Sequence, residues 1–275
     1  MKAPVYLIPF DFSSVSDHAL QLGLELANHN DGSILLLHFV AKKADLSGAK
    51  DQFKTLVDQL SESDQARTST RVLVGNIYDS IALASELIGA SLIVMGTHGA
   101  KGMQKLFGSH ALKLVSSTSV PFMITQGGTT SGEIKTIVMP YYFQRESIQI
   151  ANFAASLAKQ FNATIHLVGS HHKDEWLEVK TQTNQKVLRK FFTEHSIQHE
   201  LHNLPQSTSY QQELMNYADS VSADLIAVSY HHTDTFLPTM HSFVQELIEN
   251  EKQIPVLTVN TEDLSVTSGY FFIST

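Results

Sequence analysis

The sequence of this chain contains an internal repeat of about half its length, which limits the folds that it can adopt. Four apolar, strand-like segments of the 275-residue sequence recur in the same order 131 to 134 positions later. The pairs are 5–9 with 136–140, 33–37 with 164–168, 92–95 with 225–228, and 120–124 with 254–258. Four ordered matches that drift by only three positions indicate a duplicated unit.

Within each copy the apolar runs alternate with helical patterns. The runs are continuous, which is typical of strands buried on both faces of a parallel sheet. Helices are predicted at residues 16–30, 46–62 and 77–89 in the first copy, and at 146–161, 178–195 and 210–222 in the second. Strands alternating with helices predict right-handed crossovers. We therefore expect an α/β fold with two tandem doubly wound parallel five-stranded sheets.

The repeat also suggests domain limits. We expect one domain over residues 1–127, a second over 133–261 and a C-terminal tail over 262–275. The join at 126–132 is rich in Gly and Thr, as flexible linkers are. An apolar cluster at 270–273 either docks on the protein's own surface or serves as a partner-binding or edge-strand segment.

Composition narrows the function classes. The formal net charge is −8 and no block of basic residues occurs, which argues against nucleic acid or an anionic membrane as the main partner. No apolar run approaches the roughly 20 residues that cross a bilayer, and the N-terminus lacks the pattern of a signal peptide. The chain has no cysteine, which excludes disulfides and thiolate chemistry. A cytoplasmic location is expected.

Residues suited to ligand binding follow the first and fourth strands, where open α/β sheets bind their ligands. The first strand ends at Pro9 and is followed by Asp11, and a glycine-containing loop spans 96–109. The loop is neither a P-loop nor a G-x-G-x-x-G motif. Its glycines permit close backbone approach, and Ser109 opens a helix predicted at 110–117, which is a ready anion site.

These motifs resemble the universal stress protein family. Its nucleotide-binding members carry an Asp after the first strand and a Gly-x2-Gly-x9-Gly-Ser/Thr loop that holds ATP phosphates after the fourth. The Leu-Leu-His at 36–38 and the Val-Pro at 120–121 also match. The resemblance covers residues 2–125 well and 134–260 weakly. It implies an adenine nucleotide alpha hydrolase-like fold with strand order 3-2-1-4-5.

The same resemblance implies how the halves associate. The final strands of the two copies, 122–125 and 256–259, would pair and form an intramolecular pseudo-dimer. A further homodimer of two chains is possible under this reading.

By this resemblance Asp11 would contact the ribose or adenine of ATP or AMP, with or without Mg²⁺. The phosphates would lie on Gly96, Gly99, Gly108 and Ser109. The complete implied binding set is Pro9, Asp11, Phe39, Gly96, His98, Gly99, Gly108, Ser109 and His110.

Two features depart from the family pattern. Eight residues, one fewer than usual, separate Gly99 from Gly108. In addition, Phe39 and His110 stand where the nucleotide-binding members usually carry Val. A bulkier Phe39 would shrink an adenine pocket, and a tighter loop would displace a backbone N–H.

Several of these residues have a simpler interpretation. The loop glycines would also permit tight packing of strand against helix. His98 either stabilises a phosphate or bonds to backbone at a strand end. Lys101 and Lys105 either close over a triphosphate or remain solvated loop charges.

The second copy lacks the motif. Tyr142 stands in the place of Asp11, residues 229–232 replace the first glycines, and Ser242 and Phe243 replace Gly108 and Ser109. We therefore expect no ATP binding there in the family manner.

Two histidine pairs follow strands of the second copy, at 171–172 and 231–232. They could converge on a metal with Asp174 or Asp234, act as a pH sensor, or simply be exposed loop histidines. The sequence contains no nucleophile–base set that would establish catalysis.

The preferred hypothesis is a stress-response protein in which the first copy senses ATP or AMP and the second copy is structural. A protein-interaction module of the same fold without nucleotide is the alternative. A third hypothesis is an enzyme, a slow ATPase at most or a nucleotidyl transferase.

Overall fold

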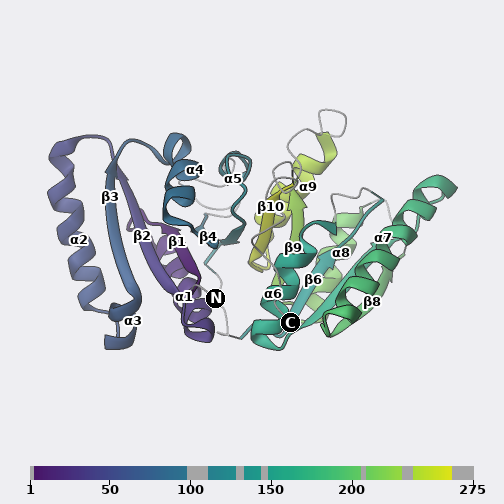
Figure 1. The fold of residues 1–275 in the computed structure, drawn as a ribbon. Coiled ribbons are helices and arrows are strands. Elements are labelled where there is room, and N and C mark those ends of the chain that lie inside the picture. The colour runs from purple at the N-terminus through teal and green to yellow at the C-terminus, as the bar shows by residue number, and fades with distance from the viewer. Residues whose placement is uncertain are drawn as a thin grey trace.

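The computed structural model describes residues 3–97, 111–127, 133–143, 148–205, 209–230 and 238–261, without the side chains of 238–242. Its centre is one ten-stranded sheet in the order β3-β2-β1-β4-β5-β10-β9-β6-β7-β8 (Figure 1). Each half of this sheet is parallel and has the order predicted from the resemblance. The two expected five-stranded sheets are therefore joined edge to edge.

The repeat is visible in the element order. The first half contains β1 (Val5–Pro9), α1 (Ser14–Asn30), β2 (Ser33–Val40), the 3-10 helix η1 (Lys43–Asp45), α2 (Leu46–Asp58), α3 (Glu62–Arg67), β3 (Thr68–Val74), α4 (Ile77–Ile88), β4 (Leu92–Gly96), α5 (Ala111–Val115) and β5 (Phe122–Thr125). The second half contains β6 (Thr136–Pro140), α6 (Ala151–Phe161), β7 (Thr164–Ser170), α7 (Glu175–Glu194), β8 (His199–Leu204), α8 (Tyr210–Ser220), β9 (Leu225–Tyr230), α9 (Pro238–Ile248) and β10 (Val256–Asn260).

Backbone details repeat as well. Val5 pairs with Ser33 in the first half as Thr136 pairs with Thr164 in the second. The first helix of each half ends in a left-handed residue, Asp31 with φ 52° and Asn162 with φ 53°. Asp and Asn tolerate this conformation better than most residues. Equivalent positions can therefore be compared directly between the halves.

Some helix limits differ from those expected. The predicted helix at 46–62 is two helices, because the Ser61 hydroxyl accepts a hydrogen bond from the Asp64 N–H (3.2 Å) and caps a new helix. The first of these helices contributes to the core, since Phe53 is buried. The predicted stop at Gly89 is confirmed, with φ 66°. In the second half, α6 begins at Ala151 rather than 146, and residues 144–147 lie outside the described part.

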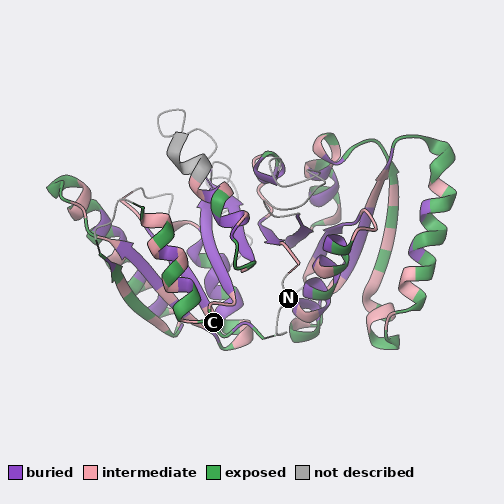
Figure 2. Cartoon of the chain, turned by 180° about the vertical axis from the view of Figure 1, so that it is seen from behind, coloured by how far each residue is buried: buried purple, intermediate pink, exposed green. Residues whose placement is uncertain are grey.

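The apolar core has two layers, one on each face of the sheet, and each layer contains residues of both halves. Figure 2 shows the buried strands between helices that expose their outer faces. No helix among the described residues is both long and apolar enough to span a membrane.

The halves meet through β5 and β10, which pair antiparallel with Met123 opposite Leu257. These are the strands at which pairing was expected. Side chains add hydrogen bonds across the junction: Gln126 donates to the Asn250 carbonyl (2.9 Å), and Asn260 donates to the Ser116 carbonyl (3.2 Å). The junction is therefore part of the core and not a loose contact.

Candidate functional site

A cavity of about 320 Å³ lies at the carboxyl ends of the strands in the first half. Residues at or just beyond the ends of β1, β2, β3 and β4 surround it. Its lining residues are Pro9, Phe10, Asp11, Ser16, Leu37, His38, Phe39, Ala41, Gly75, Asn76, Ile77, Tyr78, Met95 and Gly96. Four of the nine binding residues implied by the sequence, Pro9, Asp11, Phe39 and Gly96, are thus brought together. The other five, His98, Gly99, Gly108, Ser109 and His110, lie outside the described residues.

Asp11 is the acidic group of this cavity, and its carboxylate is held by the start of α1. Its Oδ1 accepts hydrogen bonds from the Ser13 N–H (3.0 Å), the Ser13 hydroxyl and the Ser16 hydroxyl (2.9 Å). Burial alone would raise the pKa of Asp11, but these hydrogen bonds outweigh it and hold the pKa below its ordinary value. Asp11 is therefore an ionised, fixed hydrogen-bond acceptor at neutral pH.

The chain turns sharply after Asp11. Phe12 has φ 63°, which is uncommon for a bulky residue. Its ring packs edge-on against Phe10, with ring centroids 5.3 Å apart, and at a tilt against Phe53, with ring centroids 4.9 Å apart. The surrounding aromatic packing keeps this residue in its unusual conformation, and the conformation directs the chain from the tip of β1 into α1.

Gly96 has a clear packing role. A Cβ atom at this position would lie 2.0 Å from the Val15 carbonyl oxygen and 3.1 Å from the Ser16 N–H nitrogen. The end of β4 and the start of α1 therefore touch backbone to backbone. For Gly96 the structure supports tight strand-to-helix packing, the simpler of the two interpretations of the glycines, although the residue also lines the cavity.

The end of β3 contributes residues that the sequence analysis missed. Gly75, with φ 144°, and Asn76 follow this strand, and the Asn76 side chain caps α4 by accepting from the Asp79 N–H (3.1 Å). Tyr78 lies two residues further along the chain, with the Lys113 ammonium 5.2 Å from its ring centre. Ligands of open α/β sheets bind at the carboxyl ends of the strands, and the end of the third strand is such a position.

The equivalent region of the second half is filled with aromatic rings. Tyr142, at the position of Asp11, packs edge-on against Tyr210 (5.6 Å between ring centroids) and Phe243 (5.5 Å). Tyr210 is stacked on Phe243 at 6.0 Å and donates to the Val168 carbonyl (3.0 Å). Burial raises the pKa of Tyr142 and of Tyr210 well above the usual range for tyrosine, so both are neutral.

The equivalent positions at the ends of β4 and β9 also differ. Ser229, at the position of Gly96, accepts a hydrogen bond from the Ile150 N–H (3.2 Å). The second half thus accommodates a side chain at Ser229, whereas the first half has no room for one at Gly96.

Of the two histidine pairs in the second half, the structure describes the pair at 171–172. His171 lies 3.3 Å from Glu178, and the other oxygen of that carboxylate accepts from the His172 N–H (2.8 Å). His231, His232 and Asp234 lie outside the described residues. Within the described ranges no group of three or more His, Asp or Glu side chains could hold a metal ion.

Comparisons with known proteins agree with this fold. The structure of a universal stress protein from Archaeoglobus fulgidus aligns with a TM-score of 0.73 at 16% identity, over 95% of this chain and 100% of that one. A putative universal stress protein from Pseudomonas aeruginosa UCBPP-PA14 aligns with a TM-score of 0.63 at 14% identity, over 94% of each chain. Curated protein sequences give no significant match.

The fold defines a doubly wound α/β protein of two similar halves, with a cavity at the strand ends of the first half. The model of the universal stress protein family matches residues 6–126. The first half thus belongs to the universal stress protein family, and the chain as a whole has the fold of universal stress proteins.

Proposed function

We propose that this chain is a stress-response regulator that binds an adenine nucleotide, ATP or AMP with or without Mg²⁺, in its first half. The functional units are residues 1–127 and 133–261 with a tail at 262–275, and the second unit is structural. The two units act as an intramolecular pseudo-dimer through β5 and β10. The protein works in the cytoplasm without nucleic acid or membrane, and hydrolyses ATP slowly at most.

The observation that carries this proposal is the fixed carboxylate in the first cavity. A volume of about 320 Å³ falls at the lower end of small-molecule sites. Asp11 is an ionised acceptor suited to the hydroxyl groups of a ribose. It would repel a phosphate, so the sugar and not the phosphates would lie beside it.

The apolar lining of the cavity suits a base. Phe39 and Met95 lie on its wall, and Tyr78 presents an aromatic ring. The phosphates would extend toward residues 99–109, as in the family resemblance. One solved universal stress protein that aligns with 47% of this chain, at 16% identity and a TM-score of 0.35, was determined with cAMP, which is a property of that protein.

A protein-interaction module without nucleotide is the second candidate. It is favoured by the outer face of α4, where Leu83 is 61% exposed and Leu87 is 79% exposed. Both residues lie one turn apart on the same side of the helix. An apolar pair of this kind is suited to contact another protein.

Thermal unfolding with ATP separates the two candidates. At 100 times the dissociation constant a ligand adds about 2.7 kcal/mol to the free energy of unfolding. We expect ATP or AMP to raise the melting temperature of the wild type and to co-purify with it in mass spectrometry. Asp11→Asn should abolish both effects, and the exposed neighbour Asp17→Asn is the matched control.

If the wild type is purified without bound nucleotide and millimolar ATP does not raise its melting temperature, the nucleotide proposal is wrong. The interaction module would then be favoured. A shift that is unchanged in Asp11→Asn would mean that nucleotide binds elsewhere.

A further inference from the structure

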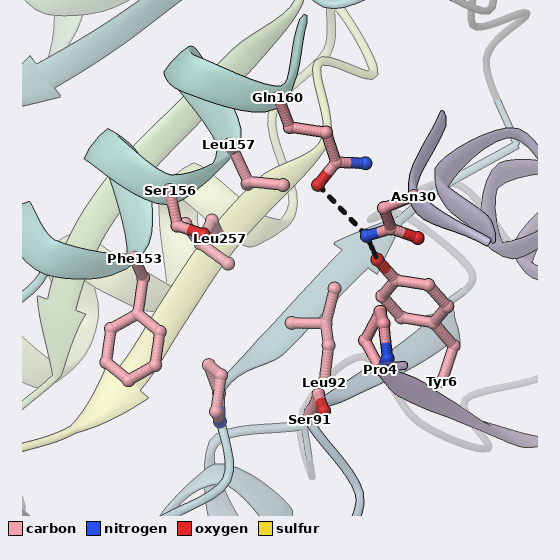
Figure 3. A pocket seen from close by; sticks show the side chains of 11 residues that line it. Pro4, Tyr6, Asn30, Ser91, Leu92, Phe153, Ser156, Leu157, Gln160 and Leu257 are labelled. Carbon is pink, nitrogen blue, oxygen red and sulfur yellow. Dashed lines mark hydrogen bonds between the residues drawn. The ribbon is translucent and has the colours of Figure 1, made fainter. Parts of the chain in front are cut away.

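A second cavity, of about 170 Å³, lies where the two halves meet. It is built from the amino-terminal ends of β1 and β4, from one side of α6 and from Leu257 of β10 (Figure 3). None of its lining residues lines the first cavity. It is therefore a separate place in the molecule.

Both halves supply apolar walls. Leu92 of the first half faces Leu157 and Leu257 of the second, and the Phe153 ring lies beside them (Figure 3). Leu257 is 1% exposed and Leu157 is 8% exposed, so these side chains are held by the core. No residue that lines the cavity is charged.

One end of the cavity is polar. The Asn30 amide donates to the Tyr6 hydroxyl within the first half and to the Gln160 Oε1 of the second half (3.2 Å). The Gln160 amide donates to the Leu26 carbonyl (3.2 Å). Burial raises the pKa of Tyr6 and outweighs the hydrogen bonds from Asn30 and Gln160, so its hydroxyl remains neutral at physiological pH.

Size and chemistry together define a ligand class. An apolar cavity of about 150 Å³ in another protein accepts benzene. A charged group would lack any counter-charge here, and burying it unpaired is costly. An apolar body with one hydrogen-bonding group would match the Leu and Phe walls and the Tyr6 end.

We propose that the junction cavity binds a small, flat, uncharged molecule, an aromatic alcohol or a nitrogen heterocycle of about the size of phenol or indole. Its ring lies among Leu92, Leu157 and Leu257, and its polar group reaches the Tyr6 hydroxyl. Because both halves form the walls, an occupied cavity strengthens the contact between them. The proposal does not depend on nucleotide binding in the first half.

Titration of the full chain with indole and with phenol, by calorimetry and by NMR of labelled methyl groups, tests this. We expect saturable binding that shifts the methyl signals of Leu92, Leu157 and Leu257. Benzoate, of similar size but charged, should bind at least about tenfold more weakly.

Matched variants locate the binding. Ser156 lines the cavity and is exposed, so Ser156→Phe should fold and weaken indole binding at least about tenfold. Asn152→Phe places the same ring on an exposed position of the same helix outside the cavity and should leave binding unchanged. Tyr6→Phe should weaken the binding of phenol roughly 2- to 12-fold and leave the binding of toluene unchanged.

The proposal is wrong if neither probe saturates, or if binding is equal in the Ser156→Phe and Asn152→Phe variants. It is also wrong if the shifted methyl groups lie away from the junction. Should Ser156→Phe fail to fold, the methyl shifts of the wild type decide alone. ATP binding, measured in parallel, should be the same in both variants and so separates this result from the nucleotide proposal.

Discussion

The carboxyl ends of the strands form an open cavity in the first half and a packed cluster of aromatic rings in the second, although the two halves share one backbone arrangement. In the first half they surround a cavity with the fixed carboxylate of Asp11. In the second half Tyr142 occupies the corresponding position and packs edge-on against two further rings. Strand order and register are the same. The difference therefore arises from side chains at the strand ends and not from the fold.

Gly96 and Asp11 lie at the carboxyl ends of neighbouring strands, but the structure gives a packing reason for the residue type at only the first of these two positions. Gly96 is required by backbone contact with Val15, whatever the cavity binds. Within the described part of the chain, the hydrogen bonds of the Asp11 side chain come from its near neighbours Ser13 and Ser16, so packing against distant elements there does not require it. Asp11 is thus the more informative residue about ligand binding.

The largest effect is expected from truncating the aromatic cluster. Tyr142→Ala removes a half-buried ring that packs against Tyr210 and Phe243, and it should lower the free energy of unfolding by about 3 kcal/mol. Asp11→Ala, at the equivalent position, loses hydrogen bonds in a half-exposed place and should cost about 1 kcal/mol. Urea unfolding of both variants measures this, and equal losses would contradict the contrast between a packed and an open site.

A second pair compares the ends of the fourth strands. Gly96→Ala should destabilise the protein by about 1–3 kcal/mol or more, because the new methyl group meets the Val15 backbone. Ser229→Ala removes one hydrogen bond from the Ile150 N–H and should cost about 1 kcal/mol. Chemical denaturation gives both values. If Gly96→Ala is neutral, the strand and helix can move apart, and the glycine would have to be explained by ligand approach.

The smallest effect concerns pH. Because hydrogen bonds lower the pKa of Asp11 in the folded protein, its ionised form stabilises the fold at pH values above its ordinary pKa of 3.8. This contribution is lost as the pH falls through the lowered value. The stability difference between wild type and Asp11→Asn should therefore be constant near neutrality and shrink below about pH 4.

NMR titration of the Asp11 carboxyl is the direct check on this prediction. Ser16→Ala should move its pKa upward, because one hydrogen bond to the carboxylate is lost. A pKa that does not respond to Ser16→Ala would show that Ser16 instead donates to the Ser13 carbonyl, which also lies within reach at 2.8 Å.

Much of the fold could be predicted because buried parallel strands leave a strong pattern. The continuous apolar runs gave the strands and their repeat, and the family resemblance gave their order. Helix ends were less predictable: the break at Ser61 depends on one capping hydroxyl within a polar stretch. The rings that fill the second site were also missed, because Tyr210 and Phe243 are more than thirty residues apart in the sequence. Only the fold brings them onto Tyr142.

The candidate site was predictable in part. Asp11 and Gly96 follow apolar runs and could be recognised as strand-end residues. Packing of strand against helix was one of two interpretations of Gly96, and the sequence could not choose between them, since no sequence pattern reports that α1 passes within contact distance of β4. Gly75 and Asn76 were overlooked because the third strand, with partly exposed residues throughout, is less apolar than its neighbours.

The antiparallel pair of β5 and β10 has a consequence for how such a protein can change over time. In an assembly of two identical chains every substitution appears twice, so both sites are kept or lost together. Here the paired units are encoded once each and cannot separate on dilution, since they share one chain. One unit can therefore exchange a ligand site for a packed aromatic cluster while its neighbour keeps an open cavity, and the asymmetry is inherited with the gene.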